Sequence, residues 1–217
     1  MTVRKRICLR EIDFATWSRA HLFKQYQGAD LPYIIISAPI DVTKLLKWSR
    51  EKDVSFYFAL VHTATQIADK IENFHYRFDG DKILRIDHNI PLLTHMRKGE
   101  ELFIMLEGMV TADRLEFCRD LRAKANDQNY NRRETVFSRH DMISFSCMPW
   151  IDYTQFVRTI IKDGEDNNPK LSWGKYTTDE QGRTTLNFSV QVHHGLMDGY
   201  HVGMFYQELQ NALNTLK

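Results

Sequence analysis

Two adjacent histidines near the end of the chain, His193 and His194, are the residues best suited to acid–base chemistry. Imidazole is the side chain whose unperturbed titration lies closest to neutral pH, so it is the usual general base of enzymes. Asp198 stands four residues after His194, and the glycines at 195 and 199 are expected to let the backbone turn sharply around the histidines. We therefore interpret this stretch as the site of a histidine general base.

Two other interpretations of the same stretch stay open at this point. His194 and Asp198 are spaced i and i+4, so on a helix they could bind zinc together with His193 or His201. The two glycines disfavour a regular helix, and no matching Cys/His pair occurs elsewhere in the sequence, so we expect no metal. The remaining alternative is that both histidines are ordinary core or surface residues.

The bulk properties of the chain exclude several classes of function. The formal net charge of the 217 residues is +1 and no long basic run occurs, which argues against nucleic acid as a partner. No run of about 18 apolar residues occurs, so we expect neither a transmembrane helix nor a membrane partner. The three cysteines, Cys8, Cys118 and Cys147, are odd in number and lack CxxC spacing, so we expect reduced thiols in a cytoplasmic setting.

Helices and strands predicted from the hydrophobic pattern must position these residues. Polar residues stand at the expected helix N-caps Asp13, Asp41, Ser55 and Thr111. The expected helices cover residues 13–26, 42–52, 56–71, 111–126 and 199–216. The expected strands cover residues 3–9, 33–38, 75–78, 83–86, 92–96, 102–106, 142–148, 170–176 and 184–192. Because these elements are mostly not in βαβ order, they favour one α+β domain, a two-layer α/β sandwich with helices packed on a mixed β-sheet.

The stretch from Val192 to Val202 resembles the active-site signature of the chloramphenicol acetyltransferase family. The HHxxxDG-type core of this signature also occurs in dihydrolipoamide acyltransferase catalytic domains and in peptide-synthetase condensation domains. Further motifs follow in the family's order: Trp17-Ser18-Arg19, Phe56-Tyr57-Phe58, Ser146-Cys147-Met148-Pro149-Trp150, Gly174-Lys175-Tyr176 and the C-terminal helix. The resemblance therefore implies a single acetyltransferase domain over residues 1–217.

The resemblance also implies the catalytic roles of three residues. His194 is expected to be the general base that takes a proton from a hydroxyl of the acceptor, whose oxygen then attacks the thioester of acetyl-CoA without an acyl-enzyme. Ser146 is expected to donate a hydrogen bond to the tetrahedral oxyanion, an interaction that typically contributes about 3 kcal/mol. Ser172 stands where the family usually has a threonine, and is expected to support the intermediate through water.

Other residues are expected to position the base and to bind the two substrates. The resemblance implies that Asp198 forms a structural ion pair with Arg19, and that the second ring nitrogen of the histidine is held by its own backbone carbonyl. Tyr176 is expected to stack on the adenine of CoA. Four aromatic residues fall near positions that bind the acceptor in the family: Tyr26, Phe103, Phe137 and Phe156.

The acceptor is the part of this expectation that the sequence leaves open. Arg158 stands where the family has an apolar residue, and an uncompensated guanidinium in an apolar pocket is expensive. The polar segment 138–141 also looks shorter than usual for the family. Chloramphenicol is therefore the default acceptor, with a related hydroxylated compound as the alternative, and antibiotic resistance is the role that the default implies.

The family is trimeric, so the resemblance implies a homotrimer with active sites between subunits. His194 is then expected from one subunit and Tyr26 from its neighbour, with Ser146 a candidate to come from the neighbour as well. Two other functions stay open: a module that binds CoA thioesters or drug-like molecules with little catalysis, and a dihydrolipoamide-type acyltransferase core. The lack of a lipoyl-bearing region in these 217 residues counts against the latter.

Overall fold

The structure is a computed structural model that describes residues 9–133, 139–160 and 166–216. Its centre is a mixed sheet, in which β9 (Thr177–Thr178) pairs with β10 off the main path. The main strand order is β2 (Tyr33–Asp41), β10 (Thr184–His193), β8 (Lys170–Trp173), β7 (Met142–Cys147), β5 (Ile90–His95) and β6 (Ile104–Glu107). The strands β5, β7 and β8 are parallel to one another, whereas β10 runs antiparallel to β8 and β2.

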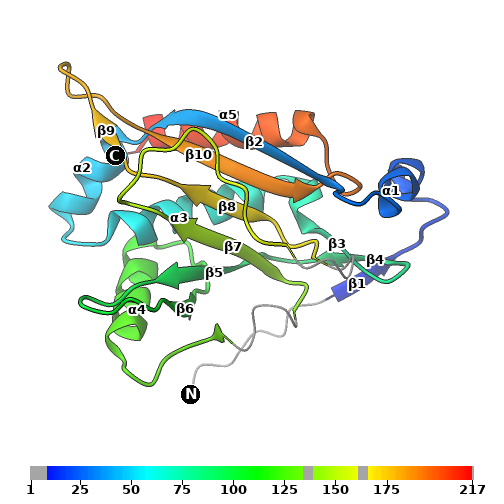
Figure 1. The fold of residues 1–217 in the computed structure, drawn as a ribbon, viewed down its shortest axis with the longest axis horizontal. Helices are drawn as coiled ribbons and strands as arrows, with labels where there is room; N and C mark the ends of the chain where they lie inside the picture. The colour runs from blue at the N-terminus through cyan, green and yellow to red at the C-terminus, as the bar shows by residue number, and fades with distance from the viewer. Residues whose placement is uncertain (1–8, 134–138, 161–165, 217) are drawn as a thin grey trace.

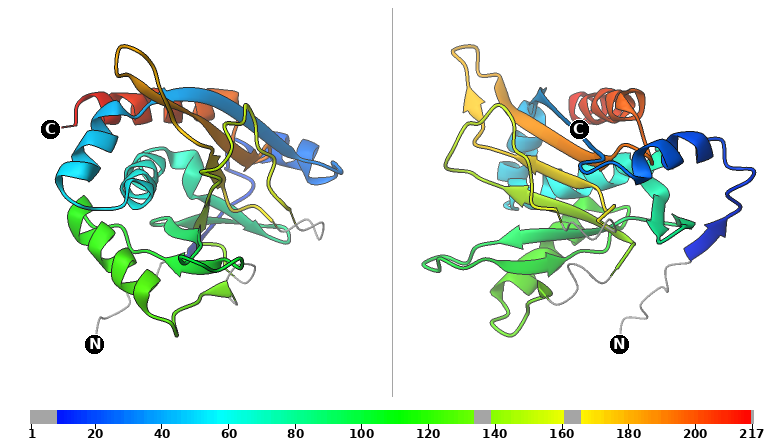
Figure 2. Two further views of the ribbon diagram at one scale, coloured as in Figure 1. Left: turned by 60° about the vertical axis from the view of Figure 1, so that its left-hand side comes forward. Right: turned by 45° about the vertical axis from the view of Figure 1, so that its right-hand side comes forward.

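Helices cover one face of this sheet, and their packing forms the core (Figure 1). They are α2 (Thr43–Glu51), α3 (Phe56–Ala68), α4 (Arg114–Asn126) and α5 (Gly199–Asn214). Figure 2 shows α5 lying behind β2 and β10, and α3 at the centre of the helical layer. The expected α+β architecture, with helices packed on a mixed sheet, is confirmed.

A small sheet and one helix extend one end of the molecule. The sheet has the order β1 (Leu9–Ile12), β4 (Lys82–Ile86) and β3 (Tyr76–Asp79), and the 3-10 helix η1 (Glu72–His75) directly precedes β3. Next to it lies α1 (Ala20–Gln27), whose Phe23 packs with Trp17, Phe78 and Leu196 in a second apolar cluster. This cluster joins α1 to the chain that follows β10.

Local sequence signals account for most element boundaries. Ser55 caps α3 as expected, since its hydroxyl accepts a hydrogen bond from the Phe58 N–H. Ten of the thirteen residues of α3 are buried, as its apolar composition on several faces predicts. The expected hairpin is also confirmed, with Asp79 pairing with Lys82 and Gly80 at a φ of 56° in the turn.

Two expected helix starts are wrong, and the expected N-cap Asp41 is displaced by one residue, since Val42 precedes α2. Residue 13 does not begin a helix: α1 starts at Ala20, because the Asp13 carboxylate bonds locally to the Ala15 N–H and closes a turn instead. The next helix is capped by Asp113, which accepts from two backbone N–H groups, and Thr111 lies before it. The expected strand at 3–9 falls almost wholly outside the described residues, where β1 begins at Leu9.

No helix within the described ranges is long and apolar enough to cross a membrane.

Candidate active site

The stretch with the two histidines links the end of β10 to the start of α5. His193 is the last residue of β10, and the His194 N–H donates to the Pro32 carbonyl at 2.7 Å, which ends the strand against the start of β2. Asp198 is the N-cap residue of α5, and its N–H donates to His201 Nδ1 at 3.0 Å. His194 and Asp198 therefore lie in a tight connection between two regular elements rather than on one helix.

The two adjacent histidines have opposite environments. His193 is 3% exposed and its ring contacts Phe78 and Tyr33 edge-on. Its Nδ1 accepts a hydrogen bond from the Gly195 N–H at 3.1 Å, so that nitrogen carries no proton. Burial, with a smaller effect of His194, lowers the pKa of His193 to about 4. His193 is thus a neutral core residue at neutral pH, whereas the His194 side chain is 27% exposed.

Arg19 holds the His194 segment from the other side. Its guanidinium donates to both carboxylate oxygens of Asp198, at 2.7 and 3.0 Å, and also to the carbonyl oxygens of His194 and Gly195. The Arg19 side chain is only 10% exposed, so this bidentate pair is strongly shielded on the arginine side. The hydrogen bonds from Arg19 are the main cause that lowers the pKa of Asp198 and keeps it ionised. The residues Arg19, Tyr26, His193, His194 and Asp198 are called the histidine corner below.

One expectation about His194 differs from the structure. The Nδ1 atom makes no hydrogen bond with its own carbonyl or with any other described residue. The carbonyl of His194 is instead the acceptor for Arg19, and Nδ1 lies 3.3 Å from Asp198 Oδ1. The carboxylate of Asp198 is therefore the group that faces this ring nitrogen.

Tyr26 covers the flat face of the His194 ring. The two rings are stacked with centroids 4.1 Å apart and an angle of 17° between their planes. Such stacking fixes the orientation of an imidazole without using its nitrogens. The expectation that Tyr26 meets His194 across a subunit boundary is therefore corrected, because α1 brings Tyr26 onto His194 within one chain.

The two glycines of the motif have a different function from the expected sharp turn. Neither Gly195 nor Gly199 is among the residues with positive φ. A Cβ at Gly195 would lie 3.1 Å from both the His193 ring and the Phe23 ring, so a side chain there would require these rings to shift. A Cβ at Gly199 would be 3.9 Å from its nearest neighbour, so that position tolerates a side chain. No group of three or more potential metal ligands occurs in the part of the chain that the structure describes.

A row of hydroxyls crosses the sheet some distance from the histidines. Cross-strand register places Ser189 of β10 between Ser37 of β2 and Ser172 of β8, and Ser172 opposite Ser146 of β7. Thr94 of β5 extends the row, with its Oγ1 3.4 Å from Ser146 Oγ. Directly paired residues share a face of the sheet, so all five hydroxyls lie on one side. We call these five residues the hydroxyl row.

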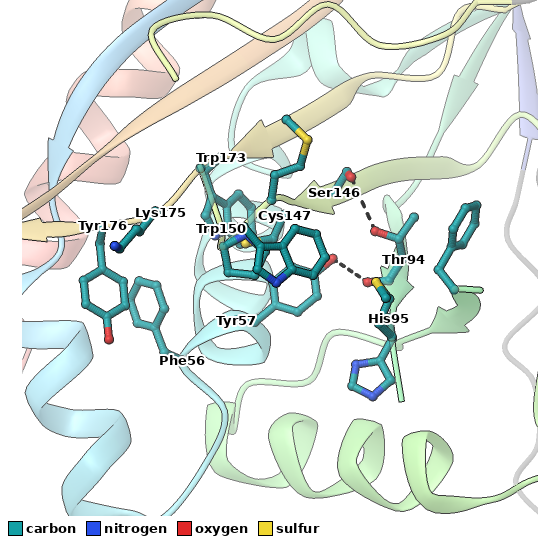
Figure 3. A pocket seen from close by; sticks show the side chains of 15 residues that line it. Phe56, Tyr57, Thr94, His95, Ser146, Cys147, Trp150, Trp173, Lys175 and Tyr176 are labelled. Atoms are coloured by element: carbon teal, nitrogen blue, oxygen red, sulfur yellow. Dashed lines mark hydrogen bonds between the residues drawn. The ribbon is translucent and has the colours of Figure 1, made fainter. Parts of the chain in front are cut away.

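The sheet opens into a pocket at one end of this row. The parallel strands β5 and β7 pair as far as Leu93 and Phe145 and then diverge. A cavity of about 650 Å³ lies in this fork (Figure 3). Its walls come from the carboxyl ends of β5, β7 and β8, where parallel strands commonly bind ligands, and from the start of α3. The lining residues are Phe56, Tyr57, Thr94, His95, Met96, Phe103, Ser146, Cys147, Met148, Pro149, Trp150, Trp173, Gly174, Lys175 and Tyr176.

Several polar groups at the fork or next to it lack partners among the described residues. The Tyr57 hydroxyl donates to the Thr94 carbonyl at 3.0 Å, but Ser172 Oγ, Tyr153 Oη and Trp173 Nε1 are buried and make no hydrogen bond within the described residues. The Tyr153 hydroxyl lies near those of Ser172 and Ser189 without reaching hydrogen-bond geometry. Buried hydroxyls without partners are rare in proteins, and an ordered water or a ligand usually satisfies them.

The expected substrate-binding residues divide between this pocket and its surroundings. Phe103 and Tyr176 line the pocket, and Tyr176 contacts Phe56 edge-on beside the exposed Lys175. Phe156 lies outside the lining, on the segment 149–160, and its N–H donates to Ser189 Oγ at 3.4 Å. Phe137 lies outside the described residues.

Arg158 has polar hydrogen-bond partners, unlike a guanidinium buried in an apolar pocket. Its guanidinium donates to the Ser144 carbonyl at 3.0 Å, and its backbone N–H donates to the Gln191 side chain at 2.8 Å. Burial lowers the pKa of Arg158, while the nearby Asp166 acts in the opposite direction. The face of the sheet around Arg158 is therefore polar.

Sequence reasoning did not assign Tyr57, Cys147, Trp150 and Lys175 to a site, although all four line the pocket. Each belongs to a motif that carried the family resemblance, and their clustering depends on the strand order, which those motifs do not reveal. Burial raises the pKa of the Cys147 thiol to about 12, so this cysteine is not a nucleophile at neutral pH.

The structure does not bring His194 and Ser146 together in one chain. Ser146 lines the pocket and His194 does not. His194 stands five residues beyond Ser189 on β10, and Ser146 lies two strands away, a separation of roughly 20 Å at standard strand dimensions. The two residues thus cannot contact the same reacting atom within one chain.

Comparisons with known proteins agree on one group of relatives. The family model described as "Chloramphenicol acetyltransferase" matches residues 7–210. The chloramphenicol acetyltransferase of Clostridium perfringens is 28% identical over 209 residues, covering 94% of both chains. That of Staphylococcus aureus is 26% identical over 208 residues, covering 93% of this chain and 97% of the relative.

Solved structures support the same fold. A structure named chloramphenicol acetyltransferase superposes with a TM-score of 0.86 at 22% identity, covering 95% of this chain and 100% of the other. The cubic core of the pyruvate dehydrogenase multienzyme complex superposes with a TM-score of 0.65 at 12% identity, covering 90% and 86%. At these identities the superpositions concern the fold alone.

Proposed function

Because this chain belongs to the chloramphenicol acetyltransferase family and is an acyltransferase, we propose that it transfers acetyl from acetyl-CoA directly to a hydroxyl of chloramphenicol or a related small acceptor. A single acetyltransferase domain over residues 1–217 carries this activity. The observation that supports it best is the combination of a half-buried, oriented imidazole in the histidine corner with a pocket at the fork that is lined by the hydroxyls of Thr94 and Ser146.

His194 is the proposed general base. Its ring is fixed by the stacked Tyr26, and its Nδ1 faces the Asp198 carboxylate, so Nε2 is the nitrogen available to an acceptor hydroxyl. As the acceptor oxygen attacks the thioester carbonyl, its proton moves to Nε2, and the imidazolium that forms is stabilised by the adjacent carboxylate. When the tetrahedral intermediate collapses, the C–S bond breaks and the proton passes to the leaving thiolate of CoA.

The fork supplies the proposed oxyanion donors and the binding site for acetyl-CoA. Ser146 is proposed to donate to the oxyanion, and the buried hydroxyl of Ser172 to hold a water that supports it. The apolar pocket suits the pantetheine arm of CoA. At its open end, Lys175 and Tyr176 offer a cation for a phosphate and a ring for adenine.

The proposed active site lies between two subunits of a homotrimer. Since His194 and Ser146 are roughly 20 Å apart within one chain, a complete site requires His194 from one copy and Ser146 from the next. The sheet supports such an arrangement, because β2 is an edge strand of the described sheet and runs beside the histidine corner. We place the enzyme in the cytoplasm, where acetyl-CoA is available, with antibiotic resistance as the corresponding role.

Release of free CoA thiol from acetyl-CoA tests the reaction directly. Purified protein is incubated with acetyl-CoA and a panel of hydroxylated acceptors that includes chloramphenicol, and the acetylated product is identified by mass spectrometry. Thiol release that requires an acceptor supports the proposal. Tight chloramphenicol binding without thiol release from any acceptor overturns it in favour of a binding module.

Mixed oligomers test the shared site. Variants His194→Ala and Ser146→Ala, each inactive alone, are unfolded, mixed in equal amounts and refolded together. In a head-to-tail ring, about one interface in four then pairs an intact His194 with an intact Ser146, so about a quarter of the wild-type activity returns. No recovery in mixed oligomers of verified composition overturns the placement between subunits.

A further inference from the structure

A second polar row lies beside the hydroxyl row on the same face of the sheet. Ser144 and Lys170 are paired across β7 and β8, and Lys170 is paired with Gln191 of β10. Each of the three stands two positions from a member of the hydroxyl row, so the two rows share a face and are about 7 Å apart. The pocket at the fork lies on the opposite side of the hydroxyl row, toward the carboxyl ends of β7 and β8.

Arg158 lies across this second row. It belongs to the segment 149–160, which crosses in front of β10 and β8 and is called the strap below (Figure 1). The Arg158 backbone is tied to the Gln191 side chain through both its N–H and its carbonyl. Its guanidinium reaches the Ser144 carbonyl. Since β8 lies between β10 and β7, the arginine side chain passes over Lys170.

The row carries an excess of positive charge. Lys170 forms an ion pair with Asp166, and both side chains are 9% exposed. Arg158 and Lys170 are close enough to repel each other, and Asp166 is the carboxylate that acts on both. Among the described residues, two cations, the buried Lys170 and the half-buried Arg158, therefore share one carboxylate. Burying such an excess is costly unless another anion compensates it.

Arg158 retains unused hydrogen-bond donors. Only Nη1 of its guanidinium donates to a described residue, which leaves Nε and Nη2 without an acceptor there. Neither atom is among the fully buried polar atoms that lack partners, so both face space that a ligand or solvent can reach. The planar Nε/Nη2 edge of a guanidinium has the geometry that binds a carboxylate through two parallel hydrogen bonds.

We propose that Arg158 and Lys170 form a subsite for a carboxylate group of the acceptor, so that this enzyme prefers hydroxylated carboxylates to neutral acceptors. The inference rests on the proposed function, because it takes Ser146 and Ser172 as the groups beside the reacting carbonyl. The acetyl donor then approaches from the fork and the acceptor from the opposite side of the hydroxyl row. An acceptor whose hydroxyl and carboxylate are separated by about the spacing of the two rows fits this arrangement.

A matched pair of acceptors provides the test. 4-(Hydroxymethyl)benzoate carries its hydroxyl and carboxylate at opposite ends of a benzene ring, and its methyl ester is the neutral counterpart. The ratio of kcat/KM for the two compounds, measured by thiol release, is expected to favour the acid at least tenfold in the wild-type enzyme. Arg158→Leu is expected to reduce this ratio by a factor of about 10 to 100, as loss of a charge-assisted bidentate contact predicts.

Two further variants keep the result interpretable. Arg158→Lys retains the charge and the backbone ties but lacks the planar fork, so it should lose part of the preference and remain folded. Arg50→Leu removes an exposed arginine on α2 and should leave the ratio unchanged. An equal ratio in wild type and Arg158→Leu, with both enzymes active on chloramphenicol, overturns the carboxylate subsite and leaves the proposed function intact.

Binding measurements separate the two possible failures. If no acceptor, including chloramphenicol, releases thiol, the proposed function fails. Calorimetric titration of wild type and Arg158→Leu with 4-(hydroxymethyl)benzoate then still tests the subsite. Tighter binding of the acid than of the ester in the wild type alone supports it, and equal binding in both proteins overturns it.

Discussion

The histidine corner and the fork differ in how far their polar groups are satisfied by hydrogen bonds within the protein. In the corner, Arg19 satisfies two carbonyl oxygens and one carboxylate at once, and Tyr26 covers the His194 ring. At the fork and on the strand next to it, the Trp173 ring nitrogen and the Ser172 hydroxyl are buried without any partner among the described residues. Apart from the Nδ1 atom of His194, which makes no hydrogen bond within the described residues, the corner is thus held by the protein itself, whereas the fork and its surroundings leave hydrogen-bonding capacity for something that binds there.

This difference fits the two functions proposed for these regions, a general base in the corner and oxyanion donors at the fork. A general base must keep one orientation before the substrate arrives, because proton transfer depends on short and well-aligned contacts. Groups that stabilise a transient oxyanion need free donors, because their partner exists only during the reaction. Replacing single residues in each region should therefore affect activity and stability to different degrees.

The largest effect is expected at the base. His194→Ala should lower kcat by a factor of about 100 to 10,000, because it removes the only proton acceptor proposed for the acceptor hydroxyl. Circular dichroism and the oligomer mass should be unchanged, since this ring is 27% exposed. His21→Ala removes an exposed histidine from α1 and is the control. An active His194→Ala enzyme would falsify the assignment of the base.

Ser146→Ala is expected to have the next largest effect. Loss of one oxyanion donor typically lowers kcat by a factor of about 100 to 1,000. KM for acetyl-CoA should change little, because the hydroxyl is proposed to act in the transition state rather than in binding. The measurement is steady-state thiol release with varied acetyl-CoA. A rise in KM at constant kcat would instead make Ser146 an ordinary binding residue.

The sequence predicts the corner far better than the fork, for a physical reason. His194, Asp198 and the start of α5 are contiguous, so one motif identifies them, and the resemblance adds Arg19. The stacking of Tyr26 within the same chain was missed, because it depends on where α1 begins. Because Asp13 forms a local turn with Ala15, the helix begins about two helical turns later than expected, which local propensity did not indicate.

The fork requires information that no single stretch contains. Its walls come from α3, β5, β7 and β8, and its existence depends on where β5 and β7 stop pairing. The sequence identified Ser146 and Ser172 only through the resemblance. The alignment of Ser37, Ser189, Ser172 and Ser146 in one row follows from strand register, which is set by tertiary packing. Arg158 was unexpected because the family has an apolar residue at its position. The same strand register places the polar residues Ser144, Lys170 and Gln191 in one row beneath it.

Breaking the ion pair of the corner should affect stability more than a surface pair does. Asp198→Asn leaves the buried Arg19 without its carboxylate, and we expect a loss of about 2–3 kcal/mol in the free energy of unfolding. This is less than the 3–5 kcal/mol of a fully buried pair, because the Asp198 side chain is 34% exposed. Asp120→Asn breaks the more exposed Lys124 pair on α4 and should cost only about 0.5 kcal/mol.

The stability difference between the wild type and Asp198→Asn should depend on pH, because the ion pair lowers the pKa of Asp198. Arg19 lowers the pKa of Asp198 below its ordinary value of 3.8, so the folded state binds that proton more weakly than the unfolded state. The stabilisation is therefore complete well above pH 3.8 and is lost as the pH falls through the lowered pKa. Urea denaturation at pH 7 and pH 3 measures it. A wild-type advantage over Asp198→Asn that grows on acidification contradicts the ion pair.

The smallest effect, and the one that separates the two regions most sharply, is expected for Ser172→Ala. This hydroxyl is buried without a partner among the described residues, so its removal should raise the free energy of unfolding by up to about 1 kcal/mol. Activity should change in the opposite direction, with kcat falling by a factor of about 10 as a weak support of the intermediate is lost. Urea denaturation and thiol release on the same preparation measure both quantities. A variant that loses both stability and activity would show that Ser172 is already satisfied before substrates bind. The fork would then be held by the protein in the same way as the corner.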